Sequence, residues 1–70
     1  MSMDESRFVV MWKYNPTSRY LKIFYQDGTA VLFHPVPEFV YQNLLRTQDK
    51  AAFVEKYLVY DLHFSHIAIA

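Results

Sequence analysis

The chain of 70 residues contains no cysteine, which excludes disulfide bonds and zinc sites with thiolate ligands. It has one glycine, Gly28, so it has no glycine-rich loop of the kind that cradles phosphate groups. No signal peptide is recognisable, and no apolar run is long enough to span a membrane. The expectation is therefore a cytoplasmic protein with no membrane partner.

Net charge is missing as well, because seven Lys and Arg residues balance seven Asp and Glu residues. This balance weakens the case for extended nucleic-acid binding, which normally leaves a basic footprint, and it favours self-association. In contrast, 53% of the residues are hydrophobic and 19% are aromatic. We expect one domain over residues 1–70, and a domain of this size cannot bury so many large side chains by itself. The surplus predicts a homo-oligomer, most simply a dimer.

The first half of the chain predicts three strands. Runs of β-branched and aromatic residues indicate strands over 7–14, 19–26 and 29–34, after a frayed terminus over 1–6. Asp27-Gly28 lies between the last two runs and predicts a two-residue hairpin turn of type I′. Together these signals predict an antiparallel meander.

Alternation along the strands predicts their faces. In the first strand it places Phe8, Val10 and Trp12 on one face and Val9 and Met11 on the other, so both faces are apolar and we expect both to be covered. The second strand divides in the same way into an apolar set and a mixed set: Leu21, Ile23 and Tyr25 against Tyr20, Lys22, Phe24 and Gln26.

The second half predicts two short helices and an extended tail. Pro37 suits the first position of a helix over 37–47, and Asp49 suits the N-cap of a second helix over 50–57. Apolar pairs four residues apart form the buried stripes of these helices: Val40 and Leu44, Tyr41 and Leu45, Phe53 and Tyr57, and Val54 and Leu58. From residue 58 to residue 70 the chain alternates with a strand period, which predicts an extended segment paired with a sheet edge of its own or a neighbouring chain. The predicted fold class is α+β: a three-stranded antiparallel meander followed by two short helices on one face, with a possible C-terminal edge strand.

The centre of the chain also carries short motifs in a characteristic order. They are Tyr14-Asn15, Leu21-Lys22-Ile23, Asp27-Gly28, Val36-Pro37-Glu38, Val40-Tyr41 and Leu44-Leu45, followed by Lys50, Phe53 and Leu58. In order and spacing, this series resembles the KTSC domain, a small module named after the C-terminus of some lysyl-tRNA synthetases. The module also occurs as a stand-alone bacterial and phage protein. The resemblance covers about residues 13–58 and departs at Val31-Leu32-Phe33, where the family has Tyr-x-Tyr. It implies RNA binding, which has been suggested for the family.

Metal binding and catalysis have little support in the residue pattern. His63 and His66 are three residues apart, so on a strand they point to opposite faces and cannot share a metal. Ser65 lies between them, but neighbouring strand residues also face apart, so no nucleophile has an adjacent base. We therefore expect no metal, no cofactor and no enzymatic activity.

The candidate site combines aromatic and basic residues near the second strand. Tyr20, Lys22 and Phe24 alternate onto one face, and aromatic side chains beside cations are how some small open sheets bind bases and phosphates. The candidate ligand-binding residues are Lys13, Arg19, Tyr20, Lys22, Phe24 and His34.

Two functions remain open. The first is a binding module for a nucleotide-like ligand or RNA, which includes a phage-type protein that sequesters a small nucleotide. The second is a protein-interaction or self-assembly module without a small ligand, in which Trp12 and Phe24 lie in the core or in a dimer interface. A pocket lined by cations and aromatic side chains favours the first, and an apolar patch without a concave site favours the second.

Overall fold

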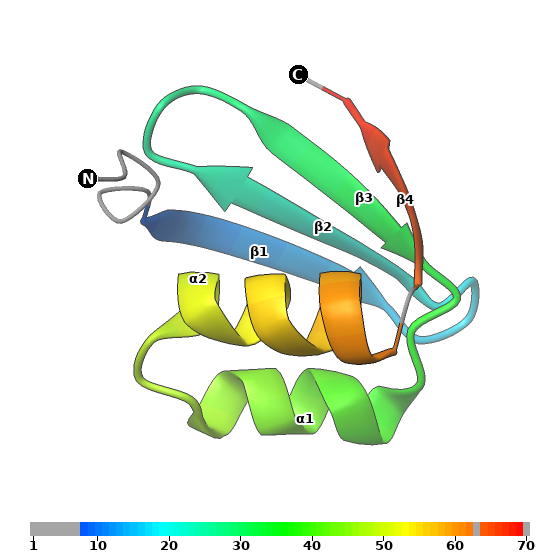
Figure 1. The fold of residues 1–70 in the computed structure, drawn as a ribbon. Helices are drawn as coiled ribbons and strands as arrows, with labels where there is room; N and C mark the ends of the chain where they lie inside the picture. Colours follow the sequence, from blue (N-terminus) through cyan, green and yellow to red (C-terminus); the bar gives the residue numbers. More distant parts are fainter. Residues whose placement is uncertain (1–7, 63, 70) are drawn as a thin grey trace.

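The computed structural model describes residues 8–62 and 64–69. Their elements follow one another as β1 (Val9–Asn15), β2 (Tyr20–Tyr25), β3 (Ala30–His34), α1 (Glu38–Arg46), α2 (Lys50–Phe53), the π-helix η2 (Val54–Asp61) and β4 (Ser65–Ala68). The strands form one antiparallel sheet in the order β1-β2-β3-β4. The helices cover one face of this sheet (Figure 1). The predicted α+β class is confirmed, and the predicted tail strand is the fourth strand.

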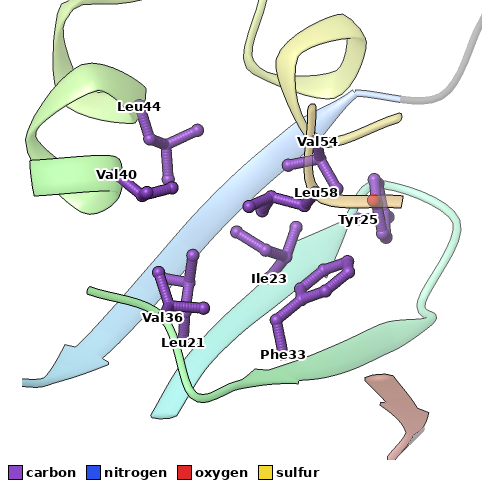
Figure 2. Close-up of a cluster of buried hydrophobic side chains, with 9 residues drawn as sticks. All are labelled: Leu21, Ile23, Tyr25, Phe33, Val36, Val40, Leu44, Val54 and Leu58. Carbon is purple, nitrogen blue, oxygen red and sulfur yellow. The ribbon is translucent and has the colours of Figure 1, made fainter. Parts of the chain in front are cut away.

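The hydrophobic core lies between the sheet and the helices. Leu21 and Ile23 of β2 are fully buried, as the alternation predicted, and Leu44 and Leu58 approach them from the two helical segments. Figure 2 shows these side chains converging on one centre. The complete cluster is Leu21, Ile23, Tyr25, Phe33, Val36, Val40, Leu44, Val54 and Leu58.

A β-bulge in β1 makes the predicted faces of that strand wrong. Val9 lies opposite Tyr25 and Met11 lies opposite Phe24, so Val10 is an extra residue with no counterpart on β2. Val9 therefore packs against the core together with Trp12, while Val10 and Met11 are exposed. The predicted alternation placed Val10 and Trp12 on the same face. The extra residue shifts the alternation by one position, so Val9 and Trp12 share a face instead.

The hairpin between β2 and β3 differs from the predicted type I′ turn. The Gly28 N–H donates to the Tyr25 carbonyl at 3.1 Å, and the Tyr25 N–H donates to the Thr29 carbonyl at 2.9 Å. Gly28 has a φ of 92°, whereas Asp27 does not have a positive φ. This is a three-residue loop in which a type I turn is followed by a left-handed glycine. The requirement for glycine at position 28 was correctly predicted, but the loop is one residue longer.

The helices begin close to the predicted positions. Pro37 is the N-cap of α1 rather than its first helical residue, because its ψ of 154° is extended. The Asp49 side chain accepts a hydrogen bond from the Ala52 N–H at 3.1 Å, which confirms it as the N-cap of α2. Val40 is buried on α1, but Leu45 is 44% exposed, so only one of the two apolar pairs predicted for this helix is buried.

The second helical segment is longer than predicted and changes type. After α2 it continues as the π-helix η2 to Asp61, so residues 58–61, assigned to the extended tail, are helical. Leu58 is fully buried in η2, and Val54 is almost fully buried. Tyr57 is 41% exposed and contacts the Phe53 ring at 5.0 Å, so that predicted pair lies at the surface.

The tail returns to the sheet of its own chain. β4 pairs antiparallel with β3, with Ile67 opposite Leu32 and Ser65 opposite His34. Of the two predicted alternatives, pairing with the sheet of the same chain or with that of a neighbouring chain, the structure has the first. The predicted fraying of residues 1–6 lies outside the described residues. Within 8–62 and 64–69, no helix is long and apolar enough to cross a membrane.

Candidate functional site on the open face of the sheet

One face of the sheet is not covered by the helices, and we call it the open face (Figure 1). Strand alternation and the pairing register assign its residues, because Leu21, Ile23 and Phe33 point to the helices. The open face comprises Met11 and Lys13 of β1, Tyr20, Lys22 and Phe24 of β2, Ala30, Leu32 and His34 of β3, and Ser65 and Ile67 of β4.

Two lysines lie side by side at the centre of this face. Lys13 is directly opposite Lys22 across the β1–β2 ladder, and both are exposed. Cross-strand partners have Cβ atoms about 5 Å apart, and like charges at that spacing are destabilising. None of the four strands contains an Asp or Glu, so no carboxylate within the sheet compensates the pair. The open face is therefore a local cationic site on a chain without net charge.

Aromatic side chains flank the lysine pair on both sides along the strands. The Tyr20 ring lies 5.4 Å from the His34 ring, with the two planes tilted by 55°. Phe24 lies two residues beyond Lys22 in the other direction, about 7 Å away along the strand. This arrangement offers rings for stacking on either side of two cations. Five of the six predicted site residues thus share one face: Lys13, Tyr20, Lys22, Phe24 and His34.

Arg19, the sixth predicted residue, lies outside this group. It belongs to the turn before β2 rather than to the strand, and its φ is 63°. The Asn15 carbonyl accepts its N–H at 2.6 Å, and its own carbonyl accepts the Val36 N–H at 2.8 Å. Burial raises the pKa of Tyr14, whose side chain points to the helix side of the sheet, and the positive charge of Arg19 partly opposes this rise. Arg19 therefore lies at the end of the sheet and is not part of the group formed by the lysine pair and its flanking rings.

Tyr14 is a structural residue that the sequence reasoning missed. Its hydroxyl donates to the Val36 carbonyl at 2.6 Å, and its ring stacks on Tyr41 with centroids 4.4 Å apart. Burial raises the pKa of this hydroxyl, the negative charge of Glu38 raises it further, and Arg19 opposes the rise. The available signal was the KTSC resemblance, which begins at Tyr14.

Trp12 is also on the helix side of the sheet, packed against the core. The Lys50 ammonium lies 5.0 Å from the centre of its ring, and the same Nζ donates to the Thr47 carbonyl at 2.6 Å. Trp12 thus belongs to the packing between β1 and the start of α2, as one of the alternatives for this residue predicted. It is not available on the open face.

A hollow on the helix side was also missed. It has a volume of about 450 Å³ and lies between α1 and the second helical segment. Phe39, Tyr57 and Leu62 line it and are 68%, 41% and 48% exposed, and Arg46 is the cation in its lining. Its other lining residues are Val40, Asn43, Thr47 and Phe53. Exposed apolar side chains and one arginine line the hollow, so it offers a contact surface.

The histidines are not arranged for metal binding in the part of the chain that the structure describes. His34 is on the open face, whereas His66 lies opposite Phe33 and contacts its ring at 5.5 Å on the helix side. His63 lies outside the described residues. No group of three or more His, Asp or Glu residues that could hold a metal ion occurs within 8–62 and 64–69.

Comparisons with known proteins place this α+β domain in a family. The chain matches the KTSC domain family over residues 5–59, and it belongs to that family. It is also similar to a crystal structure of a KTSC domain protein from Yersinia pestis, with a TM-score of 0.74 and 27% sequence identity. That match covers 93% of this chain and 87% of the other. A search of curated proteins gave no match.

Family membership confirms the resemblance identified from the motifs, and the structure explains one departure from it. Val31 and Phe33 stand where the family has Tyr-x-Tyr, and both face the helices rather than the open face. Phe33 is fully buried in the core. These two positions therefore contribute to the packing on the helix side and not to the open face.

Proposed function

We propose that this protein is a small non-catalytic binding module whose open face takes a ligand made of bases and phosphates, either single-stranded RNA or a free nucleotide. The observation that supports the proposal most directly is the Lys13–Lys22 pair, two like charges opposed on a sheet whose strands contain no acidic residue. A phosphate between the two ammonium groups would offset their repulsion and gain charge-assisted hydrogen bonds.

The flanking rings supply the second half of this recognition. Tyr20 with His34 on one side, and Phe24 on the other, are positioned for bases to stack beside the phosphate. Stacking on aromatic side chains tolerates any base and contributes about 1–3 kcal/mol per base. A four-stranded antiparallel sheet with helices behind it and aromatic residues in front is also how RNA-recognition modules bind single strands.

The proposed setting is the cytoplasm of a bacterium or of a phage-infected cell, where both RNA and signalling nucleotides occur. A phage-type protein that sequesters a nucleotide is one form of this function. The neutral chain favours a short ligand, because a site with two central lysines makes few phosphate contacts.

The test is a titration of fluorescently labelled oligouridylate, with adenosine triphosphate and a cyclic dinucleotide as competitors. Binding should weaken with salt, with a slope of log K against log [salt] of about −1.4 for two phosphate contacts on a single strand. Strong competition by one of the small nucleotides identifies a nucleotide-binding protein. Binding only to the oligonucleotide identifies an RNA-binding protein.

Lys22→Glu is the decisive variant. It should weaken binding by about tenfold or more, because it removes one cation and repels the phosphate. The fold should be at least as stable as in the parent, because a carboxylate opposite Lys13 replaces a like-charge pair with an opposite-charge pair. The matched control is Lys56→Glu, the same charge reversal at an exposed lysine of η2. If Lys22→Glu and Lys56→Glu bind equally well, the open face is not the binding site.

The alternative is a protein-interaction module, and exposed apolar residues of the same face favour it. Met11 is 44% exposed and Ile67 is 52% exposed. If neither the oligonucleotide nor the two nucleotides bind at any salt concentration, this second function replaces the first.

A further inference from the structure

The sheet has two edge strands, and they are unequally protected against pairing with another strand. β1 carries the bulge at Val10 and the charge of Lys13, which are features that natural proteins use to block edge pairing. β4 has neither, because Ser65–Ala68 and the following Ile69 contain no charged residue and no proline, and no register shift interrupts the β3–β4 pairing. Every residue of β4 is exposed, and the strand lies at the border of the sheet (Figure 1).

The hydrogen-bonding pattern shows which backbone groups of β4 point outward. The Ile69 N–H donates to the Ala30 carbonyl at 2.9 Å, so Ile69 directs its backbone groups toward β3. Backbone direction alternates along an antiparallel strand, so Ile67 also faces β3. The N–H and C=O groups of His66 and Ala68 therefore face away from the sheet, on a side where no strand of residues 8–62 and 64–69 pairs with them.

We propose that β4 pairs with β4 of a second copy of this chain, antiparallel, about a two-fold axis that passes beside Ile67. In this register, His66 of each copy exchanges an N–H···O=C pair with Ala68 of the other, so the outward groups of both copies are satisfied together. In a register shifted by one residue, the outward-facing groups of His66 would lie opposite Ile67 of the other copy, whose backbone groups point to β3, so this pair could not exchange hydrogen bonds.

The side chains of β4 fit a second copy of the same strand. At the axis, Ile67 meets Ile67 of the other copy in a non-hydrogen-bonded pair, the closer of the two antiparallel pairings, with Cα atoms about 4.5 Å apart. This contact covers a side chain that is 52% exposed in the single chain. On the opposite face, the His66 ring meets the small Ala68 of the other copy. β4 contains no Lys, Arg, Asp or Glu, so the pairing does not place like charges opposite one another. The chains also carry no net charge that would make them repel each other.

This dimer extends the proposed binding surface, and that extension rests on the proposed function. Both open faces lie on the same side of one continuous sheet, with two lysine pairs separated by β3 and β4 of each copy. Five strand spacings separate Lys22 from its counterpart, which is about 24 Å before twist is considered. One oligonucleotide could then contact both lysine pairs, whereas a single nucleotide would occupy each site separately.

The test is the mass in solution, measured by light scattering over a dilution series. The parent should approach twice the 8.4 kDa chain mass at high concentration. Ala68→Pro should weaken dimerisation by about tenfold or more, because it removes an outward N–H without removing a hydrogen bond to β3. Ala68→Ser, which keeps the N–H, is the matched control and should dimerise like the parent.

Two further measurements keep the test conclusive. If Ala68→Pro disturbs the fold by circular dichroism, Ile67→Lys replaces it, because this change leaves every backbone bond intact and places two ammonium groups at the axis. Amide exchange of His66 and Ala68 should slow as the protein concentration rises. A parent that stays monomeric throughout, or a dimer that persists in both Ala68→Pro and Ile67→Lys, overturns the proposal. The mass is measured without nucleic acid. A failure of the dimer proposal can therefore be distinguished from a failure of the proposed binding function, which the oligonucleotide titration tests.

Discussion

The hydrogen bond from Tyr14 to the Val36 carbonyl should make a measurable contribution to stability. Tyr14→Phe removes the hydroxyl and keeps the ring, so the stacking on Tyr41 at 4.4 Å is preserved. The bond that is lost is 2.6 Å long, and Val36 is fully buried, so water cannot easily replace the donor. A buried carbonyl left without its partner costs about 1–3 kcal/mol.

The expected loss is large for so small a domain. Stabilities of about 0.05–0.15 kcal/mol per residue give roughly 4–10 kcal/mol for 70 residues. A loss of about 1–3 kcal/mol should lower the melting midpoint by about 4–24 °C, at about 4–8 °C per kcal/mol. Thermal and urea unfolding of the parent and the variant measure this difference. Tyr41→Phe is the control, because no hydrogen bond of the Tyr41 hydroxyl occurs within the described residues.

The pH dependence provides a second readout of the same bond. Burial raises the pKa of Tyr14 in the folded state above its unfolded value of about 10. The folded state therefore binds the proton more tightly, and the stabilisation is fully present below about pH 10 and is lost as the pH rises through the folded pKa. The difference between the parent and Tyr14→Phe should shrink on the alkaline side. Equal midpoints for the parent and Tyr14→Phe at neutral pH would refute the assigned role of the hydroxyl.

Two other predictions concern the hairpin and the histidines. Gly28→Val should lower stability by about 1–3 kcal/mol, because a β-branched residue is strained at the φ of 92° although nothing lies near enough to clash. Gly28→Asn should cost less, because asparagine tolerates this φ. Equal melting midpoints for the two variants would contradict the strain argument. Adding a chelator should leave the melting curve unchanged, because no metal-binding cluster occurs within 8–62 and 64–69. A melting midpoint that falls with chelator and recovers with zinc would show a metal site.

The parts of the fold that were predictable from the sequence are those with a clear local signal. Alternation identified the buried face of β2, the single glycine located the hairpin, and Asp49 gave the helix N-cap. The bulge left no such signal, because Val9, Val10 and Met11 are all apolar and any of them could have been the extra residue. The π-helix was not predictable either. Apolar and polar residues alternate from Tyr60 onward with the period of a strand, although the chain is helical to Asp61.

The candidate site was predictable in its composition but not in its geometry. Lys22 could be assigned to the exposed face from its neighbours, but its position opposite Lys13 depends on the length of the turn between β1 and β2. That turn holds Arg19 in a left-handed conformation, which a sequence pattern does not reveal for a residue other than glycine. Arg19 was accordingly assigned to the strand. Neither the hollow beside Phe39 nor the hydrogen bond of Tyr14 has a local signature, because both arise from contacts between distant segments.

The strand order also determines how the domain opens locally. β2 is bonded on both sides by strands that are close to it in the sequence, and it contributes Leu21 and Ile23 to the core. β4 joins the sheet only after both helical segments, through a longer loop closure, and its side chains are exposed. Opening of β4 therefore costs only a small part of the global free energy, whereas opening of β2 requires nearly all of it. In the single chain, the strand that offers its edge to a partner is also the strand that detaches most easily, so a partner bound at that edge would stabilise the domain where it is weakest.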